Sequence, residues 1–130
     1  MKIFGIGTDI VNIRRFDKSL KRHGNRFKNR IFSKKEINYC EKKKNPSAFY
    51  AKRFAAKEAL SKALGIGIGK DLNFNNIEIS NDFKGKPSIR LKGSIKNYVK
   101  KKINNKKYKI YLSLTDDIPC AQATVIISFY

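Results

Sequence analysis

Hydrophobic and polar residues alternate along several short stretches of this chain, and this period of two predicts β-strands. The predicted strands are residues 2–11, 76–80, 88–91, 108–115 and 123–129, with turns at 84–87 and 116–119. Two glycines, Gly5 and Gly7, interrupt the first strand. Because glycine weakens a strand, we expect a bend there or a close approach of another part of the backbone.

Longer stretches between the strands repeat their apolar residues with a helical period. The predicted helices are Ile13–His23, a short helix that begins after Ser33, Ser47–Leu64 and Ser94–Ile103. Gly24 and Gly65 stand where the first and third of these helices are expected to end, and Ser33 with Glu36 forms a capping box. Together these elements predict an α+β fold, a compact single domain with a mostly antiparallel sheet packed against three or four helices.

The length and composition also indicate one domain, spanning residues 1–130, with 41% hydrophobic residues to supply a core. No apolar run approaches the length of about 18 residues that a membrane-spanning helix needs. The sequence opens without the pattern of a secretory leader. Two cysteines and one histidine cannot form a disulfide framework and do not favour a zinc cluster. We therefore expect a soluble, cytoplasmic protein.

The chain is strongly basic, with 30 basic residues against 10 acidic ones and a formal net charge of +20. This charge favours an acidic protein or a phosphorylated ligand as a partner. Lysines outnumber arginines by 23 to 7 and spread along the whole chain, so A/T-rich codons also explain part of the excess. Because no RNA-recognition, KH or zinc-finger pattern accompanies the charge, we expect neither a nucleic-acid partner nor a membrane partner.

Two acids are conspicuous because acids are rare in this chain and both have apolar neighbours. Asp9 lies in GIGTDIV, where it either caps N–H groups at the end of a strand or binds a ligand. Glu58 lies in FAAKEALSKAL. At about 100° per residue, Glu58, Ser61 and Lys62 share the helix face opposite a stripe of alanines and leucines. The simplest interpretation of that face is a weak, solvated pair between Glu58 and Lys62.

Two neighbouring features favour a functional site on this helix face. The alanine-rich stripe predicts close packing against another element, and the helix leads into a glycine-rich loop, Gly65–Gly69, that can approach a ligand through its backbone. An acid can hold a cation, while a hydroxyl and a lysine can bind phosphate. The pattern therefore predicts a site for a phosphate group and a metal ion.

Two sequence blocks, GIGTDIV near the start and RFAAKEALSKALGIGIG about forty residues later, resemble the holo-(acyl-carrier-protein) synthases, the small phosphopantetheinyl transferases. The similarity continues through FNNIEISNDFKGKP and SLTDDIPCAQATVIIS and so covers nearly the whole chain. It implies transfer of the 4′-phosphopantetheine group from coenzyme A to a serine of apo acyl carrier protein, with release of adenosine 3′,5′-bisphosphate, in support of fatty acid biosynthesis. It also implies Mg²⁺ as the cofactor and a homotrimer with active sites between subunits.

The resemblance assigns roles to residues by their place in these blocks. Asp9 and Glu58 are the expected magnesium ligands, and Lys62 is expected near the phosphates, so these three are the expected catalytic residues. The expected coenzyme A pocket includes Arg53, Ser61, Lys62 and Gly65. Arg15, on the first basic helix, falls where the family meets its acidic carrier protein. Other residues of that helix expected to help docking are Arg14, Lys18 and Arg22.

The chain departs from the family pattern at one position. Many members carry a histidine after S-[IL]-[ST], whereas Asp116 follows Ser113-Leu114-Thr115 here. The contacts of that strand with coenzyme A are therefore open. The base that takes the serine proton is open as well, since Glu58 and a metal-bound water both fit. The single histidine, His23, lies at the end of a basic helix and is expected at the surface.

Two other classes of protein account for part of the pattern. A basic RNA-binding module would explain the charge, and a non-enzymatic scaffold that binds acyl carrier protein would explain the basic helix. Neither gives a reason for Asp9, Glu58 and Lys62 to occur together, and this combination favours the transferase.

Overall fold

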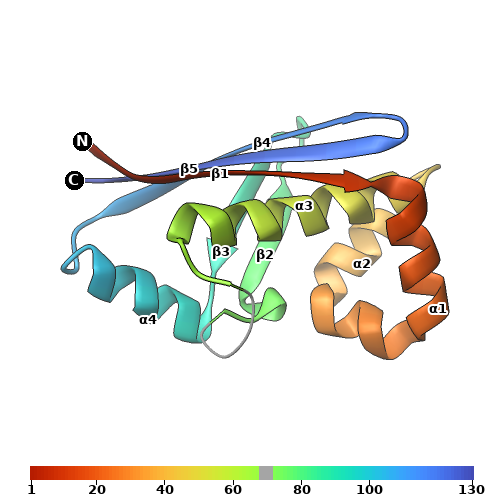
Figure 1. Cartoon of the computed structure of the whole chain (residues 1–130), viewed down its shortest axis with the longest axis horizontal. Helices are drawn as coiled ribbons and strands as arrows, with labels where there is room; N and C mark the ends of the chain where they lie inside the picture. Colours follow the sequence, from red (N-terminus) through yellow and green to blue (C-terminus); the bar gives the residue numbers. More distant parts are fainter. Residues whose placement is uncertain (68–71) are drawn as a thin grey trace.

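The computed structural model describes residues 1–67 and 72–130. In chain order its elements are β1 (Lys2–Asn12), α1 (Ile13–Ile31), α2 (Lys34–Glu41), α3 (Pro46–Leu64), the short 3-10 helix η1 (Phe74–Asn76), β2 (Ile77–Asn81), β3 (Pro87–Leu91), α4 (Gly93–Lys102), β4 (Tyr108–Asp117) and β5 (Cys120–Phe129). Within the described residues there are four α-helices, and every strand pair is antiparallel (Figure 1). The predicted α+β class is confirmed.

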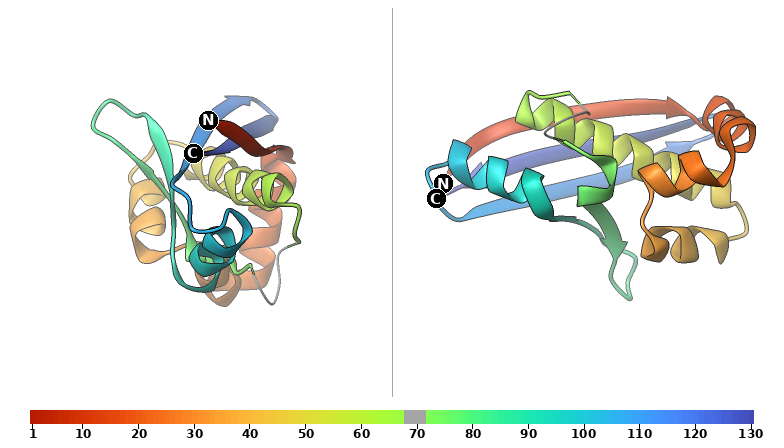
Figure 2. Two further views of the ribbon diagram at one scale, coloured as in Figure 1. Left: turned by 90° about the vertical axis from the view of Figure 1, so that its left-hand side faces the viewer. Right: turned by 90° about the horizontal axis from the view of Figure 1, so that it is seen from below.

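A long three-stranded sheet, in the order β1–β5–β4, forms one layer of the molecule, and β2 and β3 form a separate hairpin. Helix α3 runs along one face of the long sheet, as Figures 1 and 2 show. Helix α1 continues from the end of β1 and α2 lies near the same end, whereas α4 lies near the other end, close to both termini. The main core is therefore the layer between α3 and the sheet.

The contact between α3 and β1 is a contact between backbones. A Cβ atom added to Gly5 would lie 1.9 Å from the carbonyl oxygen of Ala63, and one added to Gly7 would lie 1.9 Å from that of Ala59. No side chain fits at either distance, so both glycines are needed for the helix to sit this close. The close approach predicted at Gly5 and Gly7 is confirmed, and the alanine-rich stripe of α3 is the surface that makes it.

The last two strands form a longer hairpin than the sequence predicts. Residues 116 and 117 still belong to β4, where Asp116 pairs with Ala121 and Asp117 with Cys120. The turn, predicted over four residues, is confined to Ile118 and the residue that follows it. The aspartates resembled a turn by residue type, but in an exposed hairpin end the cross-strand ladder continues through them.

Gly24 breaks the first helix without ending it. Its backbone has φ 72° and ψ −168°, values outside the helical region, and α1 resumes after it and continues to Ile31. The helix is interrupted at Gly24 as expected of a glycine, but the prediction that it ends there is wrong. The second half is retained because Ile31 is buried and Phe27 packs against the core. The capping box is confirmed: Ser33 Oγ accepts from the Glu36 backbone N–H, and Glu36 Oε1 accepts from that of Ser33.

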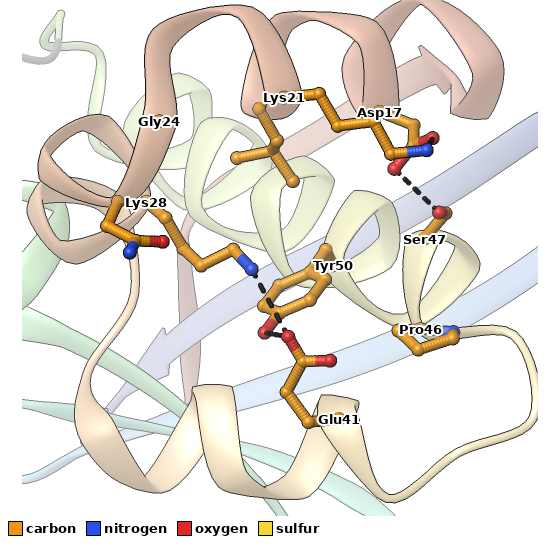
Figure 3. Close-up of a pocket in the computed structure, with 10 residues that line it drawn as sticks. Asp17, Lys21, Gly24, Lys28, Glu41, Pro46, Ser47 and Tyr50 are labelled. Atoms are coloured by element: carbon orange, nitrogen blue, oxygen red, sulfur yellow. Dashed lines mark hydrogen bonds and ion pairs between the residues drawn. The ribbon is translucent and has the colours of Figure 1, made fainter.

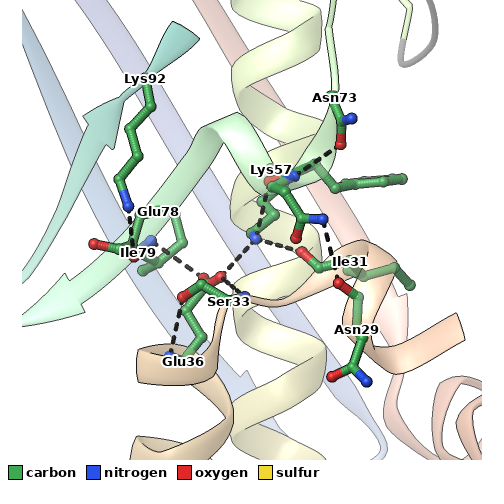
Figure 4. A network of polar contacts seen from close by, with 11 residues as sticks. Asn29, Ile31, Ser33, Glu36, Lys57, Asn73, Glu78, Ile79 and Lys92 are labelled. Carbon is green, nitrogen blue, oxygen red and sulfur yellow. Dashed lines mark hydrogen bonds and ion pairs between the residues drawn. The ribbon is translucent and has the colours of Figure 1, made fainter. Parts of the chain in front are cut away.

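Helix α3 carries a buried charge that its apolar stripe does not reveal. Lys57 is fully buried and donates to Glu36 Oε1 at 2.7 Å, Ile31 O at 2.5 Å and Phe74 O at 3.1 Å (Figure 4). Glu36 in turn accepts from the backbone N–H of Ile79 at 3.2 Å. This Lys57–Glu36 pair ties α3 to α1, α2, η1 and β2. Buried ions persist when all their hydrogen-bonding groups are satisfied.

The face of the long sheet turned away from α3 is mixed in character, with a few apolar residues among threonines and serines. Ile6 on β1, Ile126 on β5 and Tyr111 on β4 stand in register across it. Ile6 and Ile10 are both 66% exposed. Among the residues that the structure describes, no helix has the length and apolar character needed to cross a membrane.

Candidate active site between β1 and α3

The two conspicuous acids lie next to each other in space. Asp9 is on the side of β1 that carries Gly5 and Gly7, so it faces α3, and its side chain is only 17% exposed. Lys62 Nζ donates to Asp9 Oδ1 and to the carbonyl oxygen of Thr8, both at 3.0 Å. Glu58 lies one helical turn before Lys62. The predicted grouping of Asp9, Glu58 and Lys62 is therefore present in the structure.

The electrostatics of the site bring two like charges together. The pKa of Glu58 is raised, mainly by burial and further by the negative charge of Asp9, while Lys62 opposes the shift. A divalent cation between the carboxylates would remove this repulsion. Two carboxylates with open positions suit Mg²⁺, which prefers oxygen ligands and keeps several waters. Elsewhere in the described chain, no cluster of three or more histidine, cysteine, aspartate or glutamate residues could hold a metal.

An open cavity of about 370 Å³ brings the acids to the start of α1. Its lining includes Asp9, Glu58, Arg15, Phe16 and Phe54. Arg15 enters the cavity because α1 begins directly after β1, where the Asn12 side chain caps the helix by accepting from the Arg15 backbone N–H at 3.0 Å. One basic residue predicted to meet the partner thus borders the predicted metal ligands.

The other basic residues of α1 that are predicted to help docking lie on its solvent side. Arg14, Lys18 and Arg22 are exposed together with Arg15. His23 is exposed as well, with its ring 5.1 Å from that of Phe27, which confirms the expected surface position. The first half of α1 therefore presents a continuous positive surface, which we call the basic α1 face (Arg14, Arg15, Lys18 and Arg22).

Two residues of α3 and its end that are predicted for the coenzyme A pocket differ in exposure. Gly65 ends α3 in the left-handed region with φ 71°, and it is exposed. Ser61 is only 4% exposed, and its hydroxyl donates to the carbonyl oxygen of Glu58 at 2.9 Å. The expectation that Ser61 shares an open face with Glu58 and Lys62 is wrong for this structure. Part of the predicted glycine loop, residues 68 and 69, lies outside the described residues.

Arg53 lies on a different side of α3 from the acids. It is 1% exposed, its guanidinium stacks 4.2 Å from the centre of the Tyr39 ring, and its Nη2 donates to Asn81 Oδ1 at 2.7 Å. Its Nε has no hydrogen-bond partner among the described residues. A cavity of about 250 Å³ adjoins it, lined also by Lys52 and by the β2–β3 hairpin. One chain therefore does not bring Arg53 and Glu58 into a single cavity.

Two polar features of the region were not found in the sequence. Asp116, which departs from the expected family pattern, accepts from Lys52 Nζ at 3.0 Å and so is part of an ion pair. The second feature is the buried Lys57, and its position on the helical wheel gave a sign of its burial. On the helical wheel it falls about 20° from the edge of the alanine stripe, a position that is rarely solvated.

The geometry defines a class of protein before any relative is considered. An α+β domain that places two carboxylates beside an open cavity, with a lysine paired to one of them, fits an enzyme that handles a phosphorylated substrate with a divalent cation. A family model for the 4′-phosphopantetheinyl transferase superfamily matches residues 5–122, and the chain belongs to this superfamily.

Named relatives agree with this membership. The chain is 44% identical over 126 residues to a holo-[acyl-carrier-protein] synthase of Brucella ovis, covering 96% of this chain and 94% of the relative. The crystal structure of the Helicobacter pylori holo-[acyl-carrier-protein] synthase in complex with coenzyme A is 40% identical, with a TM-score of 0.81 and coverage of 95% and 99%. The Neisseria meningitidis synthase structure is 34% identical, with a TM-score of 0.86 and coverage of 98% and 99%. The predicted resemblance is confirmed.

Proposed function

We propose that this chain transfers the 4′-phosphopantetheine group from coenzyme A to a serine of apo acyl carrier protein, and so supports fatty acid biosynthesis. The observation that carries the proposal is the meeting of Asp9, Glu58 and Lys62 beside one open cavity, in a chain whose relatives are named for this reaction. The reaction breaks the bond between the two phosphates of coenzyme A and releases adenosine 3′,5′-bisphosphate. Transfers of this kind depend on positioning and charge neutralisation.

Asp9 and Glu58 are the residues proposed to hold Mg²⁺. The ion, when bound, neutralises charge on the pyrophosphate oxygens. The chain's own contribution is to fix two carboxylates at a half-buried place from two rigid elements, β1 and α3. Because these elements touch through their backbones at Gly5 and Gly7, the two ligands have little freedom to move apart.

Lys62 is proposed to bind the phosphates and offset the charge that builds on the leaving bisphosphate. Its side chain is 56% exposed, so it can exchange Asp9 Oδ1 for a phosphate oxygen without crossing the core. Occupation of Asp9 by a cation would release Lys62 for this exchange. The Asp9–Lys62 pair therefore describes the arrangement before substrate binds.

The proposed coenzyme A pocket joins two surfaces of the chain. Lys62 pairs with Asp9 and Gly65 ends the same helix, while Arg53 lies at the separate cavity beside Lys52 and the β2–β3 hairpin. Because one chain keeps these surfaces apart, we propose the homotrimer with active sites at subunit interfaces. The exposed apolar stripe of Ile6, Ile126 and Tyr111 supplies a surface that such an assembly would bury.

The basic α1 face is the proposed docking surface for acyl carrier protein. It adjoins the cavity of the two acids through Arg15, and it suits a strongly acidic partner. The same proposal places the enzyme in the cytoplasm, where the two free cysteines of the described chain, Cys40 and Cys120, would stay reduced.

The proposed reaction is tested by mass spectrometry of the carrier protein. The full-length protein is incubated with apo carrier, coenzyme A and magnesium, and the carrier should gain the mass of phosphopantetheine. The gain should disappear when a chelator replaces magnesium and should be strongly slowed with Glu58→Gln. An unmodified carrier under conditions where a relative's enzyme modifies it would refute the proposal.

The docking surface has its own test in steady-state kinetics. Arg15→Glu should raise KM for the carrier protein by about tenfold at low salt with little change in KM for coenzyme A, since charge steering acts on encounter. The defect should shrink at 1 M salt, where the Debye length is about 3 Å. A charge reversal at Lys101, at the end of α4, is the matched control. Equal defects in the two variants would mean that diffuse charge attracts the carrier.

A further inference from the structure

Both termini and α4 lie at one end of the molecule (Figure 1), and a further concave surface is found there. It is a cleft of about 520 Å³ lined by Lys100, Asn105, Lys106, Lys107, Tyr108, Lys109 and Tyr130, which we call the lysine cleft. The register of β1 with β5 runs from Lys2 opposite Phe129 to Asp9 opposite Ala123. At about 3.3 Å per residue, this places the lysine cleft roughly 23 Å from Asp9.

The charges of the lysine cleft are unbalanced. Four lysines line it together with no aspartate or glutamate, and none of these lysines has an ion pair in the described part of the chain. The carboxylate of Tyr130 is the one anionic group that the described residues give this lining. The cavity between α1, α2 and α3, shown in Figure 3, is the opposite case. There Lys21 pairs with Asp17 at 3.0 Å, and Lys28 pairs with Glu41 at 3.2 Å. The protein therefore pairs the lysines of one cavity with acidic side chains, whereas the four lysines of the other exceed the single carboxylate beside them.

The backbone around the lysine cleft is fixed by hydrogen bonds. The Asn105 N–H donates to Lys100 O at 2.8 Å, and the Lys106 N–H donates to Ile103 O at 3.1 Å. At the other wall, the Tyr130 N–H donates to Lys107 O at 2.9 Å. These bonds hold the Cα atoms of the lysines at set positions around one hollow. Four lysines on a fixed backbone around one hollow distinguish this surface from the lysines scattered elsewhere.

We propose that the lysine cleft is a second ligand site, separate from the active site, for a phosphate chain of nucleotide size. Its volume lies in the range of small-molecule sites. Ammonium groups bind phosphate as point charges, and several of them suit a chain of two or three phosphates. Tyr108 and Tyr130 provide aromatic surface on which a nucleobase can pack. The shared chemistry is the phosphate chain, carried by a nucleoside polyphosphate or by inorganic polyphosphate.

A fluorescence titration tests the site directly. The chain contains no tryptophan, so Tyr130→Trp creates a single reporter in the cleft. ATP and inorganic tripolyphosphate, each without magnesium, should give saturable fluorescence changes that weaken as salt rises. Tighter binding of ATP would assign the site to a nucleotide, whereas equal affinity would assign it to the phosphate chain alone.

Charge reversal separates a built site from general attraction. Adding Lys100→Glu and Lys107→Glu to the reporter protein should weaken binding at least tenfold. Adding Lys42→Glu and Lys44→Glu, two exposed lysines outside the cleft, changes the net charge equally and should weaken it less than threefold. Equal loss in both proteins, or a reporter that never saturates, would overturn the proposal. Phosphopantetheine transfer should be unchanged by reversal in the cleft, so this test and that of the proposed function can fail independently.

Discussion

Two lysines of α3, five residues apart, have opposite surroundings. Lys57 is fully buried and donates to three fixed oxygens from α1, α2 and η1. Lys62 is 56% exposed and donates to the first strand, to Asp9 and the Thr8 carbonyl oxygen. At about 100° per residue the two side chains leave the helix some 140° apart, so one helix turns one ammonium inward and the other outward.

The difference shows what burial does to the same chemical group. Burial lowers the pKa of Lys57, while Glu36 favours its charged form, so the ammonium is stable only with its partners in place. It cannot leave them without exposing a carboxylate in the core. Lys62 has water as an alternative partner and can move to a ligand. Lys57 therefore holds the architecture, whereas Lys62 is available for the reaction.

Removing the buried lysine should have the largest effect. Lys57→Met leaves Glu36 charged and unpaired in the core, and we expect a loss of about 3–5 kcal/mol in the free energy of unfolding. Lys62→Met, the matched change at the exposed lysine, should lose about 1 kcal/mol or less. Urea denaturation of both variants measures this difference. Equal losses would mean that the Lys57–Glu36 pair is no more important to the fold than a surface pair.

Changing the carboxylates near Lys62 should have the opposite effect to changing Lys57: it should lower activity and leave stability nearly unchanged. Glu58→Gln and Asp9→Asn should keep the fold and lower the rate of phosphopantetheine transfer by about 10²–10³, as when a group that stabilises developing charge is removed. Circular dichroism and carrier-modification kinetics at saturating magnesium report the two properties separately. Turnover close to that of the unmodified protein would remove these residues from the metal site.

The exposed lysine itself should have a smaller kinetic effect. Lys62→Ala should lower kcat by about tenfold to a hundredfold and change KM for coenzyme A little, because its charge is needed most on the leaving group. Steady-state kinetics separates the two constants. A raised KM with normal kcat would instead make Lys62 an anchor for the ground-state phosphates.

The smallest expected effect is that of Glu58 on the melting temperature, which should depend on pH. Because the pKa of Glu58 is raised in the fold, its ionisation destabilises the folded protein. That penalty is absent below the unfolded pKa of about 4.3 and is complete above the folded pKa. Glu58→Gln should therefore raise the melting temperature slightly at pH 7 with chelator present, but not at pH 4. Magnesium should reduce the gain at pH 7, and a lower melting temperature at pH 7 would contradict the inferred repulsion with Asp9.

Much of the site could be predicted because its signals are local. Gly5 and Gly7 predict a close contact, and the alanines of α3 supply the surface for it. The helical period places Glu58 and Lys62 on one face. Asp9 follows Gly7 by two residues and so lies on the same side of the strand. Each of these inferences uses neighbours in sequence and a regular period.

The parts that could not be predicted depend on distant partners. Lys57 is buried because its oxygen partners on α1, α2 and η1 cover that side of α3. Ser61, which the helical wheel alone places in the open, is only 4% exposed. Gly24 was correctly identified as a break, but the return to helix depends on Ile31 reaching the core. Periodicity describes one element at a time, and burial is decided by the others.

The direct contact of α3 with β1 also bears on how such a site survives sequence divergence. The separation between the elements that carry the two acids is set by carbonyl oxygens against glycines, atoms that every other substitution leaves in place. Changes in the size of surrounding core residues can be absorbed on the far sides of the helix and sheet. Related structures with as little as 26% identity still share this fold over almost the whole chain. Two glycines without side chains thus make the positions of Asp9 and Glu58 largely independent of the rest of the sequence.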